Sequence, residues 1–347
     1  MNRAESPEGQ IAPLVSVIVP NFNGRDILEQ CLNSLVNARH HRNQLEIIVV
    51  DNGSTDGSQE MLERKHGVKL VALGENEGFA AAVNSGVKES KGEFIALVNN
   101  DVELSPEWFD RVVAALSKDA KIAAATGKVL FRDRPQTVND LGDTLLLNGA
   151  GLHRGLGMPD EARAEIAYVG APSGAACLIR KSDFLAVGGF DDSYFAYFED
   201  IDLGWRFWLS GHKVVCVSSA VAYHKWRWTA KKFGNEFKCY HDAKNSFATF
   251  VKNAERRYLP EAFLLWILRV LFDGVRRTKA GDGRAIIGIV RSLSWCSRNL
   301  RPLLSKRSRI QHRRIISDSY LIELGVLGRL REALGEVMRI RKLAWLL

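Results

Sequence analysis

Each of four apolar segments in the first hundred residues of this chain ends in a cluster of small polar residues. The clusters are NFNG at 21–24, DNGS at 51–54, ENEG at 75–78 and NND at 99–101. Their amide, hydroxyl and carboxylate groups can hydrogen bond a nucleotide and offer hard oxygen ligands to a divalent cation. One cluster alone would be ordinary turn chemistry, because Asn, Asp and Gly are common turn formers. Four successive clusters favour a binding site.

A second group of chemically capable residues lies between positions 199 and 224. Glu199 and Asp200 are adjacent in FEDIDLGWR, and His224 ends a later apolar segment. A carboxylate can act as a general base towards a hydroxyl group, and a neutral imidazole can ligate Mn²⁺ or Mg²⁺ beside oxygens. The alternative is that these acids only begin a helix. Asp202 and Arg206 also have the i, i+4 spacing of an ion pair.

The segments that precede the four clusters have the composition of buried parallel strands. VSVIVP, LEIIVVD, VKLVALG and EFIALV are continuous apolar runs, and a helical pattern follows each. Right-handed crossovers would bring the carboxyl ends of these strands to one edge, where ligands bind in such sheets. The sequence therefore predicts a doubly wound α/β fold. Helix starts are expected at Ser105-Pro106 and at Thr55 or Asp56.

Composition narrows the class of protein. A chain of 347 residues that is 46% hydrophobic can bury a sizeable core. The five cysteines are scattered without a CxxC pair, so we expect reduced, mostly buried thiols rather than disulfides or a zinc site. The first ten residues lack the apolar core of a signal peptide, and no apolar run is long enough to span a membrane, so a cytoplasmic location is expected.

The positive charge is concentrated at the C-terminal end. The net charge is +8, but residues 255–347 contain 20 Lys and Arg against 8 Asp and Glu. Apolar residues at helical spacing alternate there with arginines, which is typical of basic amphipathic helices at an anionic membrane surface. The alternative is a packed helical domain or a dimer interface with a solvated basic face. Nucleic acid is a weaker option, because no basic and aromatic recognition module is present.

No phosphate-binding glycine loop is present, so a bound diphosphate would need another cation, which indicates a metal. The motifs VSVIVPNFNG, IIVVDNGSTDGS, NEGFAAAVNSG, LVNNDVEL, GGFDDSYFAYFEDIDLGWR and AYH, in this order, resemble the family 2 inverting glycosyltransferases of GT-A fold, especially the bacterial rhamnosyltransferase-like branch. The resemblance covers about residues 14–250. It implies a nucleotide-sugar binding half (14–121) and an acceptor and catalytic half (122–250). An N-terminal tail (1–13) precedes them, and the basic amphipathic helical region predicted from charge and spacing follows them (251–347).

The resemblance also implies a role for each cluster. Asp51 matches the acid that accepts a hydrogen bond from the pyrimidine N3–H. Residues 99–101 take the place of the family's DxD motif, with Asn99 for the first aspartate, so Asp101 is expected to be the sole carboxylate ligand of the metal. The residues implied to bind the nucleotide-sugar are Pro20, Asn21, Asn23, Asp51, Asn52, Ser54, Asn76, Gly78, Asn84, Asn99 and Asn100.

Catalysis is implied to lie in the second half. Asp200, with Glu199 beside it, matches the general base, while Asp101 and His224 match the ligands of Mg²⁺ or Mn²⁺. Direct attack by an acceptor hydroxyl at C1 would invert the anomeric centre. Trp226 and Trp228 either stack on sugars or pack in the core. The acceptor-side residues are expected to be Ser173, Gly174, Asp202 and Trp205.

The expected function is transfer of a sugar from a pyrimidine nucleoside diphosphate sugar to a hydroxyl of a cell-surface or lipid-linked glycan precursor. dTDP-rhamnose is the first choice of donor and a UDP-hexose the second. Two alternatives are a non-catalytic nucleotide-sugar binding subunit of a glycan-assembly complex and a nucleotidyltransferase. The basic tail adds an expected peripheral contact with the inner face of the plasma membrane. The oligomeric state stays open, with a homodimer as one option.

Overall fold

The computed structural model describes residues 14–38, 44–161, 165–225 and 233–329, together with 331, 332 and 335. The predicted tail at 1–13 and the tryptophans Trp226 and Trp228 lie outside these residues. All five cysteines are unpaired and buried, as the sequence predicted.

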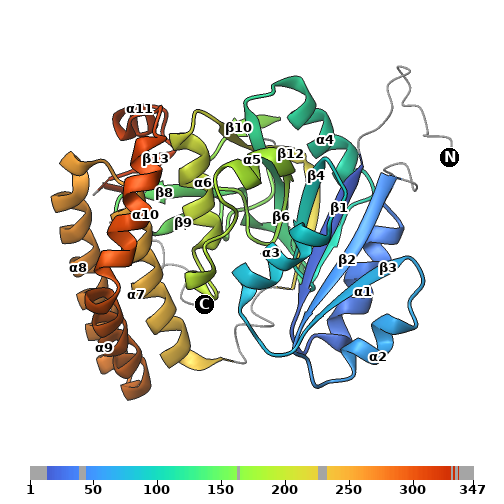
Figure 1. Cartoon of the computed structure of the whole chain (residues 1–347), viewed down its shortest axis with the longest axis horizontal. Coiled ribbons are helices and arrows are strands. Elements are labelled where there is room, and N and C mark those ends of the chain that lie inside the picture. Colours follow the sequence, from blue (N-terminus) through green and yellow to red (C-terminus); the bar gives the residue numbers. More distant parts are fainter. Residues whose placement is uncertain are drawn as a thin grey trace.

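The N-terminal half is a parallel sheet of four strands in the order β4-β1-β2-β3. This confirms the α/β architecture predicted from the alternating pattern, and Figure 1 shows the crossover helices beside the sheet. The strands are β1 (Val15–Asn21), β2 (Leu45–Asn52), β3 (Val68–Leu73) and β4 (Phe94–Val98). The crossover helices are α1 (Arg25–Val36), α2 (Ser58–Glu63) and α3 (Phe79–Glu89). The carboxyl ends of these four strands are called the ligand edge below.

The same sheet continues through the second half of the chain with mixed strand directions, to ten strands in all among the described residues. Its further strands are β5 (Val102–Leu104), β6 (Ile122–Phe131), β7 (Arg134–Asp140), β10 (Ile166–Tyr168), β11 (Ala176–Arg180) and β12 (Lys213–His224). A small second sheet consists of β8 (Asp143–Leu146), β9 (Gly151–His153) and β13 (Leu327–Gly328). The helices of this half are α4 (Trp108–Lys118), α5 (Lys181–Ala186) and α6 (Glu199–Leu209).

Two helices begin later than the sequence predicted. Helix α4 begins at Trp108 rather than after Ser105, because Ser105 forms a turn in which its carbonyl accepts the Trp108 amide. Helix α2 begins at Ser58, after Gly57 in the left-handed region at φ 81°. Asp56 instead accepts hydrogen bonds from the amides of both Arg25 and Ser58, and so ties the starts of α1 and α2 together.

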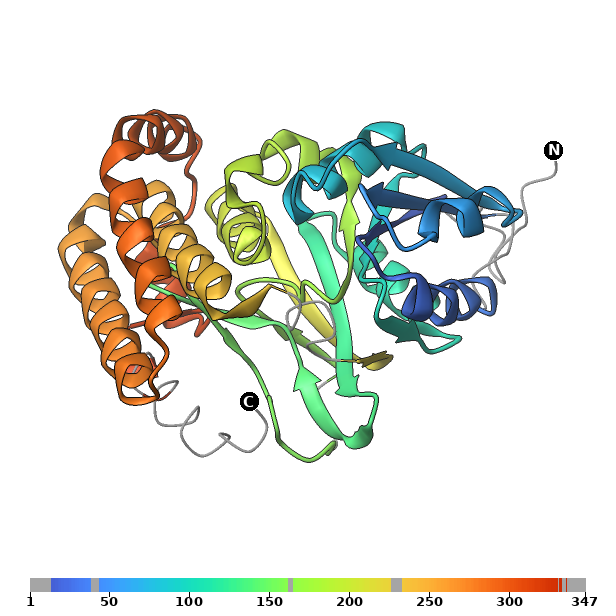
Figure 2. The same cartoon turned by 90° about the horizontal axis from the view of Figure 1, so that it is seen from below.

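The C-terminal region is helical, as predicted, and stands beside the sheet domain (Figures 1 and 2). Helix α7 runs across position 250. Trp266 donates a hydrogen bond to the carbonyl of Ala243, which joins α8 to α7. The helices are α7 (Gly234–Asn253), α8 (Leu259–Lys279), α9 (Gly283–Arg298), α10 (Leu300–His312) and α11 (Asp318–Glu323).

None of the helices in the described part of the chain combines the length and the apolar character that crossing a bilayer requires.

Candidate functional site

The polar clusters meet at the ligand edge, because β1 and β2 are in parallel register with Asn21 beside Asp51. Asn21 donates to Asp51 Oδ2 at 3.0 Å and accepts from Asn100 Nδ2 at 2.8 Å. The Ser54 amide donates to Asp51 Oδ1 at 2.9 Å. Three clusters that are far apart in the sequence are therefore one hydrogen-bonded network, which fixes the side chains in place before any ligand binds.

The third cluster joins the same network through Asn52. Its Nδ2 donates to Asn76 Oδ1 and to the Gly78 carbonyl, and its Oδ1 accepts the Glu77 amide at 2.9 Å. Gly78 has φ 91°, and a Cβ there would lie 2.5 Å from the Phe195 carbonyl oxygen. Only glycine suits this position, where the backbone of the ligand edge meets the segment that leads to Glu199.

The other predicted nucleotide-side residues lie in different surroundings. Pro20 and Asn99 are partly buried at the ends of β1 and β4, and the Asn99 amide donates to the Ala175 carbonyl at 2.9 Å. Asn23 has φ 50°, and its amide donates to Ser54 Oγ. Asn84 bonds residues 190–192 through both ends of its side-chain amide. In this structure Asn84 therefore joins α3 to that loop instead of joining the network of Asn21 and Asp51.

Asp51 is fully buried. Gln59 Nε2 donates to Asp51 Oδ1 at 2.8 Å, and Gln59 itself is partly exposed. A nucleobase that donates to the same oxygen would therefore have to replace the hydrogen bond from Gln59.

The two predicted metal ligands lie together. Asp101 directly precedes β5, and His224 pairs with Val102 in the antiparallel register of β5 and β12. His224 Nε2 lies 3.3 Å from Asp101 Oδ1, and both side chains are largely buried. On its other side the ring contacts Asn139, with Nδ1 2.9 Å from Oδ1. Because the Asn139 oxygen can only accept, it favours the Nδ1–H tautomer, which leaves Nε2 free to ligate a cation beside Asp101.

The two predicted catalytic carboxylates lie at the start of α6. Asp200 is partly exposed, whereas Glu199 is buried and its Oε2 has no hydrogen-bond partner among the described residues. Burial, followed by the charge of Asp143, raises the pKa of Asp200 to about 7. Burial and then the charge of Asp200 raise the pKa of Glu199 to about 8. Near neutral pH the pair therefore shares protons, with Asp200 the more accessible base.

Sequence reasoning missed three residues next to Asp200. Asp143 and His153 are directly paired in the register of β8 and β9, and His153 Nδ1 lies 3.0 Å from Asp143 Oδ1 and 3.7 Å from Asp140 Oδ2. Neither carboxylate belongs to a motif, and the hairpin alone brings the histidine to them. Their pairing could have been found only if the turn between the two strands had been predicted.

The acceptor-side predictions divide into two pairs. Ser173 and Gly174 lie beside Asp200, and a Cβ on Gly174 would be 2.7 Å from Asp200 Oδ2. For Asp202 and Trp205 the prediction is wrong, because both side chains are fully buried. Asp202 pairs with Arg206 and Lys252, and Trp205 Nε1 donates to Asp318 at 3.2 Å. Both residues hold α6 against the C-terminal helices, so neither can contact an acceptor.

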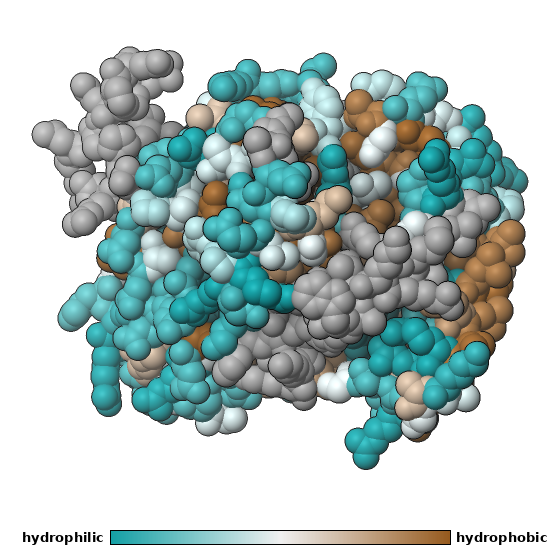
Figure 3. All heavy atoms as spheres, turned by 180° about the vertical axis from the view of Figure 1, so that it is seen from behind, coloured by the Kyte–Doolittle hydropathy of each residue, from teal (hydrophilic) through white to brown (hydrophobic). Residues whose placement is uncertain are grey.

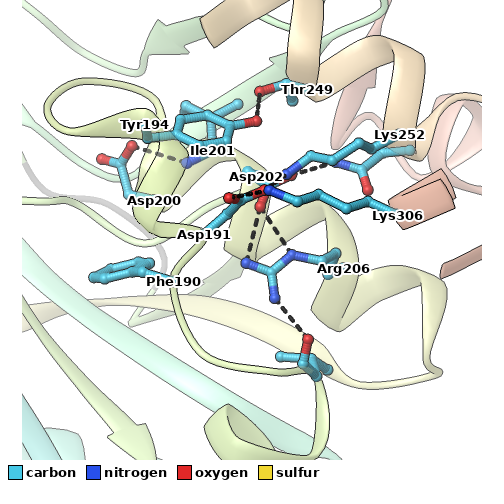
Figure 4. Close-up of polar contacts among 12 residues, drawn as sticks. Phe190, Asp191, Tyr194, Asp200, Ile201, Asp202, Arg206, Thr249, Lys252 and Lys306 are labelled. Atoms are coloured by element: carbon cyan, nitrogen blue, oxygen red, sulfur yellow. Dashed lines mark hydrogen bonds and ion pairs between the residues drawn. The ribbon is translucent and has the colours of Figure 1, made fainter. Parts of the chain in front are cut away.

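The loop that leads to the catalytic carboxylates has an unusual backbone, which the C-terminal helices hold in place. Phe195, Tyr197 and Phe198 have φ between 62° and 70° without being glycine. Asn245 Nδ2, on α7, lies within hydrogen-bond distance of three carbonyls of residues 194–197. Figure 4 shows Lys252 and Lys306 converging on Asp191, at 2.7 and 2.6 Å. Part of the predicted basic region thus supports the site from within.

Comparisons with known proteins agree with this geometry. Residues 16–155 match the family model described as "Glycosyl transferase family 2". The N-acetylglucosaminyl-diphospho-decaprenol L-rhamnosyltransferase of Mycobacterium tuberculosis is 30% identical over 261 residues, which cover 67% of this chain and 83% of that protein. The uncharacterized protein y4gI of Sinorhizobium fredii is 31% identical over 227 residues, but the match covers only 24% of its length.

A solved structure confirms the fold. The mannosyltransferase of Pyrobaculum calidifontis, in complex with GDP-Man and Mn²⁺, aligns with a TM-score of 0.55 at 17% identity. The alignment covers 90% of this chain and 88% of that one. At this identity the likeness shows the fold alone, which is the predicted GT-A architecture with a central sheet and flanking helices.

Proposed function

The chain belongs to glycosyl transferase family 2, and we propose that it transfers a sugar from a nucleoside diphosphate sugar to an acceptor hydroxyl with inversion. One observation carries the proposal. The segment before β11 touches both halves of the site, because the Ala175 carbonyl accepts the Asn99 amide while Gly174 packs against Asp200. A donor at the ligand edge would therefore have its sugar near a partly exposed carboxylate, as direct displacement requires.

Asp200 is the proposed general base. Its raised pKa, about 7, suits a group that must be ionised before the reaction and must accept a proton from a hydroxyl during it. The acceptor oxygen would attack C1 as Asp200 takes its proton, and the diphosphate would leave on the opposite side. This route needs no enzyme nucleophile, and the close approach of the Gly174 backbone helps to fix the carboxylate in place.

Asp101 and His224 are the proposed ligands of a divalent cation, either Mn²⁺ or Mg²⁺. An oxygen and an imidazole nitrogen 3.3 Å apart, with Asn139 supporting the ring, form a donor set that suits these ions. Such an ion would neutralise the charge that develops on the departing diphosphate. The other ligands would be diphosphate oxygens, because Asn99 stands where the family's DxD motif has its first aspartate.

The proposed donor carries a pyrimidine base, with dTDP-rhamnose the first choice and a UDP-hexose the second. Asp51 supports a pyrimidine with an N3–H, and the name of the mycobacterial relative supports rhamnose. The same relative supports a cell-surface or lipid-linked glycan precursor as the acceptor.

The deciding experiment is calorimetric binding of dTDP, UDP, GDP and ADP, each with and without Mn²⁺, to the wild type and to Asp101→Ala. We expect metal-dependent binding of dTDP or UDP that the variant loses. Binding that ignores both Mn²⁺ and Asp101 would contradict the proposed metal site. Transfer abolished in Asp200→Asn would exclude a binding subunit without activity, and release of pyrophosphate from a nucleoside triphosphate would favour a nucleotidyltransferase instead.

Peripheral contact with the inner face of the plasma membrane is also proposed, through one face of α8. Four apolar residues on this face follow at i, i+4, i+7 and i+11, and each is at least half exposed: Leu264, Leu268, Leu271 and Val275. Figure 3 shows hydrophobic residues gathered along the edge of the molecule where α8 lies. Arg276, Arg277 and Lys279 follow on the same helix, so charge favours an anionic lipid surface over a second, equally basic copy.

A further inference from the structure

A buried acidic cluster lies beside Asp200, and the mechanism above does not use it. Asp140 and Asp143 are 4% and 1% exposed, while the side chain of His153 is 50% exposed. Neither oxygen of Asp143 accepts a hydrogen bond from any other described residue, so its one close polar contact is the His153 ring at 3.0 Å. A buried carboxylate without donors needs a positive neighbour to stay ionised.

The cluster and Asp200 are joined through two small residues. A Cβ on Gly151 would lie 3.1 Å from Asp143 Oδ1 and 2.3 Å from Ile201 Cδ1, so only a glycine separates Asp143 from the residue after Asp200. On the other side, Ser173 is near enough to Asp140 to lower the pKa of that carboxyl, and the adjacent Gly174 packs against Asp200. Asp140 and Asp143 therefore flank the imidazole of His153, and Asp200 lies near enough for the charges to interact.

The charges on this group are coupled. The Asp143 carboxylate, with smaller help from Asp140 and Asp200, raises the pKa of His153 to about 10. The imidazolium in turn opposes the two effects that raise the pKa of Asp200, which are burial and the charges of Asp143 and Asp140. Two further titratable groups face Asp200. They are Glu199 on α6 and the Cys177 thiol on β11, and burial raises the pKa of both. His153 is thus the one cationic group among the main influences on the pKa of Asp200.

We propose that His153, held as an imidazolium by Asp140 and Asp143, is a positioning residue that keeps Asp200 ionised and able to act as the base at neutral pH. The inference rests on the proposed function, because it assumes that Asp200 takes the acceptor proton. His153 itself does not touch the reacting atoms.

A divalent cation is the competing occupant of the cluster. The ligand atoms of Asp140, Asp143 and His153 all lie within 4.8 Å of one another, which is close enough to hold a metal ion. An ion there would displace the imidazolium proton and carry the positive charge itself. A measurement can distinguish the imidazolium from the metal ion, because His153 stays protonated in the presence of Mg²⁺ only if no ion binds to the cluster.

The first test is an NMR titration of the full-length protein, which needs no activity. The imidazole signals of His153, assigned with His153→Gln, should stay those of the protonated ring up to pH 8 with or without Mg²⁺. The carboxyl carbon of Asp200 should titrate at higher pH in His153→Gln than in the wild type, by about one pH unit. Titration of His153 near pH 6.5, loss of its proton when Mg²⁺ is added, or an unchanged Asp200 would each overturn the proposal.

The second test is the pH profile of kcat/KM for sugar transfer. Without the imidazolium, Asp200 loses its proton only at higher pH. The acid limb of the kcat/KM profile of His153→Gln should therefore shift to higher pH. The rate should then fall about tenfold at pH 6 and stay near the wild-type value at pH 9. His153→Lys keeps the positive charge and should restore the wild-type limb. His212→Gln, which removes a histidine near Asp183, is the matched control and should change nothing.

The two tests separate the inference from the proposed function. Absence of transfer by the wild type, or transfer retained by Asp200→Asn, would contradict the base assignment, whatever the titration shows. A normal wild-type reaction with identical acid limbs in the wild type and His153→Gln would overturn the inference alone.

Discussion

At the residue scale, the site depends on how closely the backbone approaches Asp200. Gly174 has no side chain at the point where a Cβ would be 2.7 Å from the carboxylate. A contact this short cannot be accommodated without moving one of the two groups. The position of the proposed base is therefore set by a glycine that sequence reasoning assigned only to the acceptor side.

Replacing this glycine should displace the base. We expect Gly174→Ala to lower kcat by about tenfold to a hundredfold, because misplacing a catalytic group by about 1 Å costs that much. Gly74→Ala is the control, since nothing lies within 4 Å of a Cβ there. Both variants should bind the nucleotide like the wild type in calorimetry. Wild-type kcat in Gly174→Ala would show that Asp200 has room to move.

The raised pKa of Asp200 also predicts a cost in stability. An aspartate in an unfolded chain has a pKa of about 3.9, and in the folded protein that of Asp200 is about 7. A raised folded-state pKa means that ionisation destabilises the fold as pH rises from about 4 to 7. Asp200→Asn should therefore raise Tm by at least about 2 °C at pH 8 and leave it unchanged near pH 4. An equal Tm at pH 8, measured by calorimetry, would argue against the buried charge.

At the same scale, Asn139 supports the proposed metal site. Because its oxygen favours one tautomer of His224, Asn139→Ala should weaken Mn²⁺-dependent nucleotide binding by about tenfold to a hundredfold. Binding measured without Mn²⁺ should not change, which provides an internal control. If the Mn²⁺ dependence stays that of the wild type, His224 does not need this support.

At the element scale, α7 and α10 hold the loop before α6 in its unusual conformation. Burial opposes ionisation of Asp191, but Lys252 and Lys306 outweigh it and hold the pKa of Asp191 well below its usual range. Lys252 also contacts Asp202 Oδ1 at 2.9 Å. One buried lysine on α7 therefore joins the loop to the helix that carries the proposed catalytic pair (Figure 4).

Removing that lysine should be costly. We expect Lys252→Met to reduce the free energy of unfolding by about 3–5 kcal/mol, because Asp191 and Asp202 each lose one of their two cationic partners in a largely buried place. Lys238→Met on the same helix is the matched control. Its ion pair with Asp242 has the same 2.7 Å distance, but its side chain is 45% exposed, so little change is expected. Urea unfolding of both variants measures the difference, and equal losses would contradict the structural role given to Lys252.

At the scale of the whole molecule, the basic C-terminal region has an inward side that supports the site and an outward side that is proposed to contact a membrane. Lys306 and Arg314 turn inward, to Asp191 and Asp318. The apolar face of α8 turns outward, with Leu268 and Leu271 at 50% and 60% exposure. Removing the region altogether would not separate the two functions, because α7 packs against the site loop on one side and against α8 on the other.

Point variants can test the outward face alone. Leu268→Gln with Leu271→Gln should reduce flotation with vesicles of anionic phosphatidylglycerol several-fold, because apolar area drives insertion at the interface. Leu185→Gln on α5 changes a leucine of similar exposure, 56%, and should float like the wild type. Equal flotation of all three proteins would exclude this face as the membrane contact. If the double variant instead changes from dimer to monomer in sedimentation, the face binds a second copy of the chain.

The sequence by itself determined the parallel half of the sheet and the edge that is proposed to bind the donor. Continuous apolar runs with helices between them allow few topologies, and that topology brings strand ends such as Asn21 and Asp51 together. The sequence also predicted that Asp101 and His224 lie close together, because each belongs to a motif of the family that the chain resembles.

The tertiary structure alone decided which polar residues face the site and which support it. Asp202 and Trp205 lie in the same motif as Asp200, yet the packing of α6 against α7 buries them. Asp140, Asp143 and His153 carry no motif. The β8–β9 hairpin pairs Asp143 with His153, and Asp140 ends the preceding strand, so the three come together beside the proposed base only in the folded chain. The physical reason is that local patterns specify an element and its buried face, whereas the charge around a residue depends on segments far away in the chain.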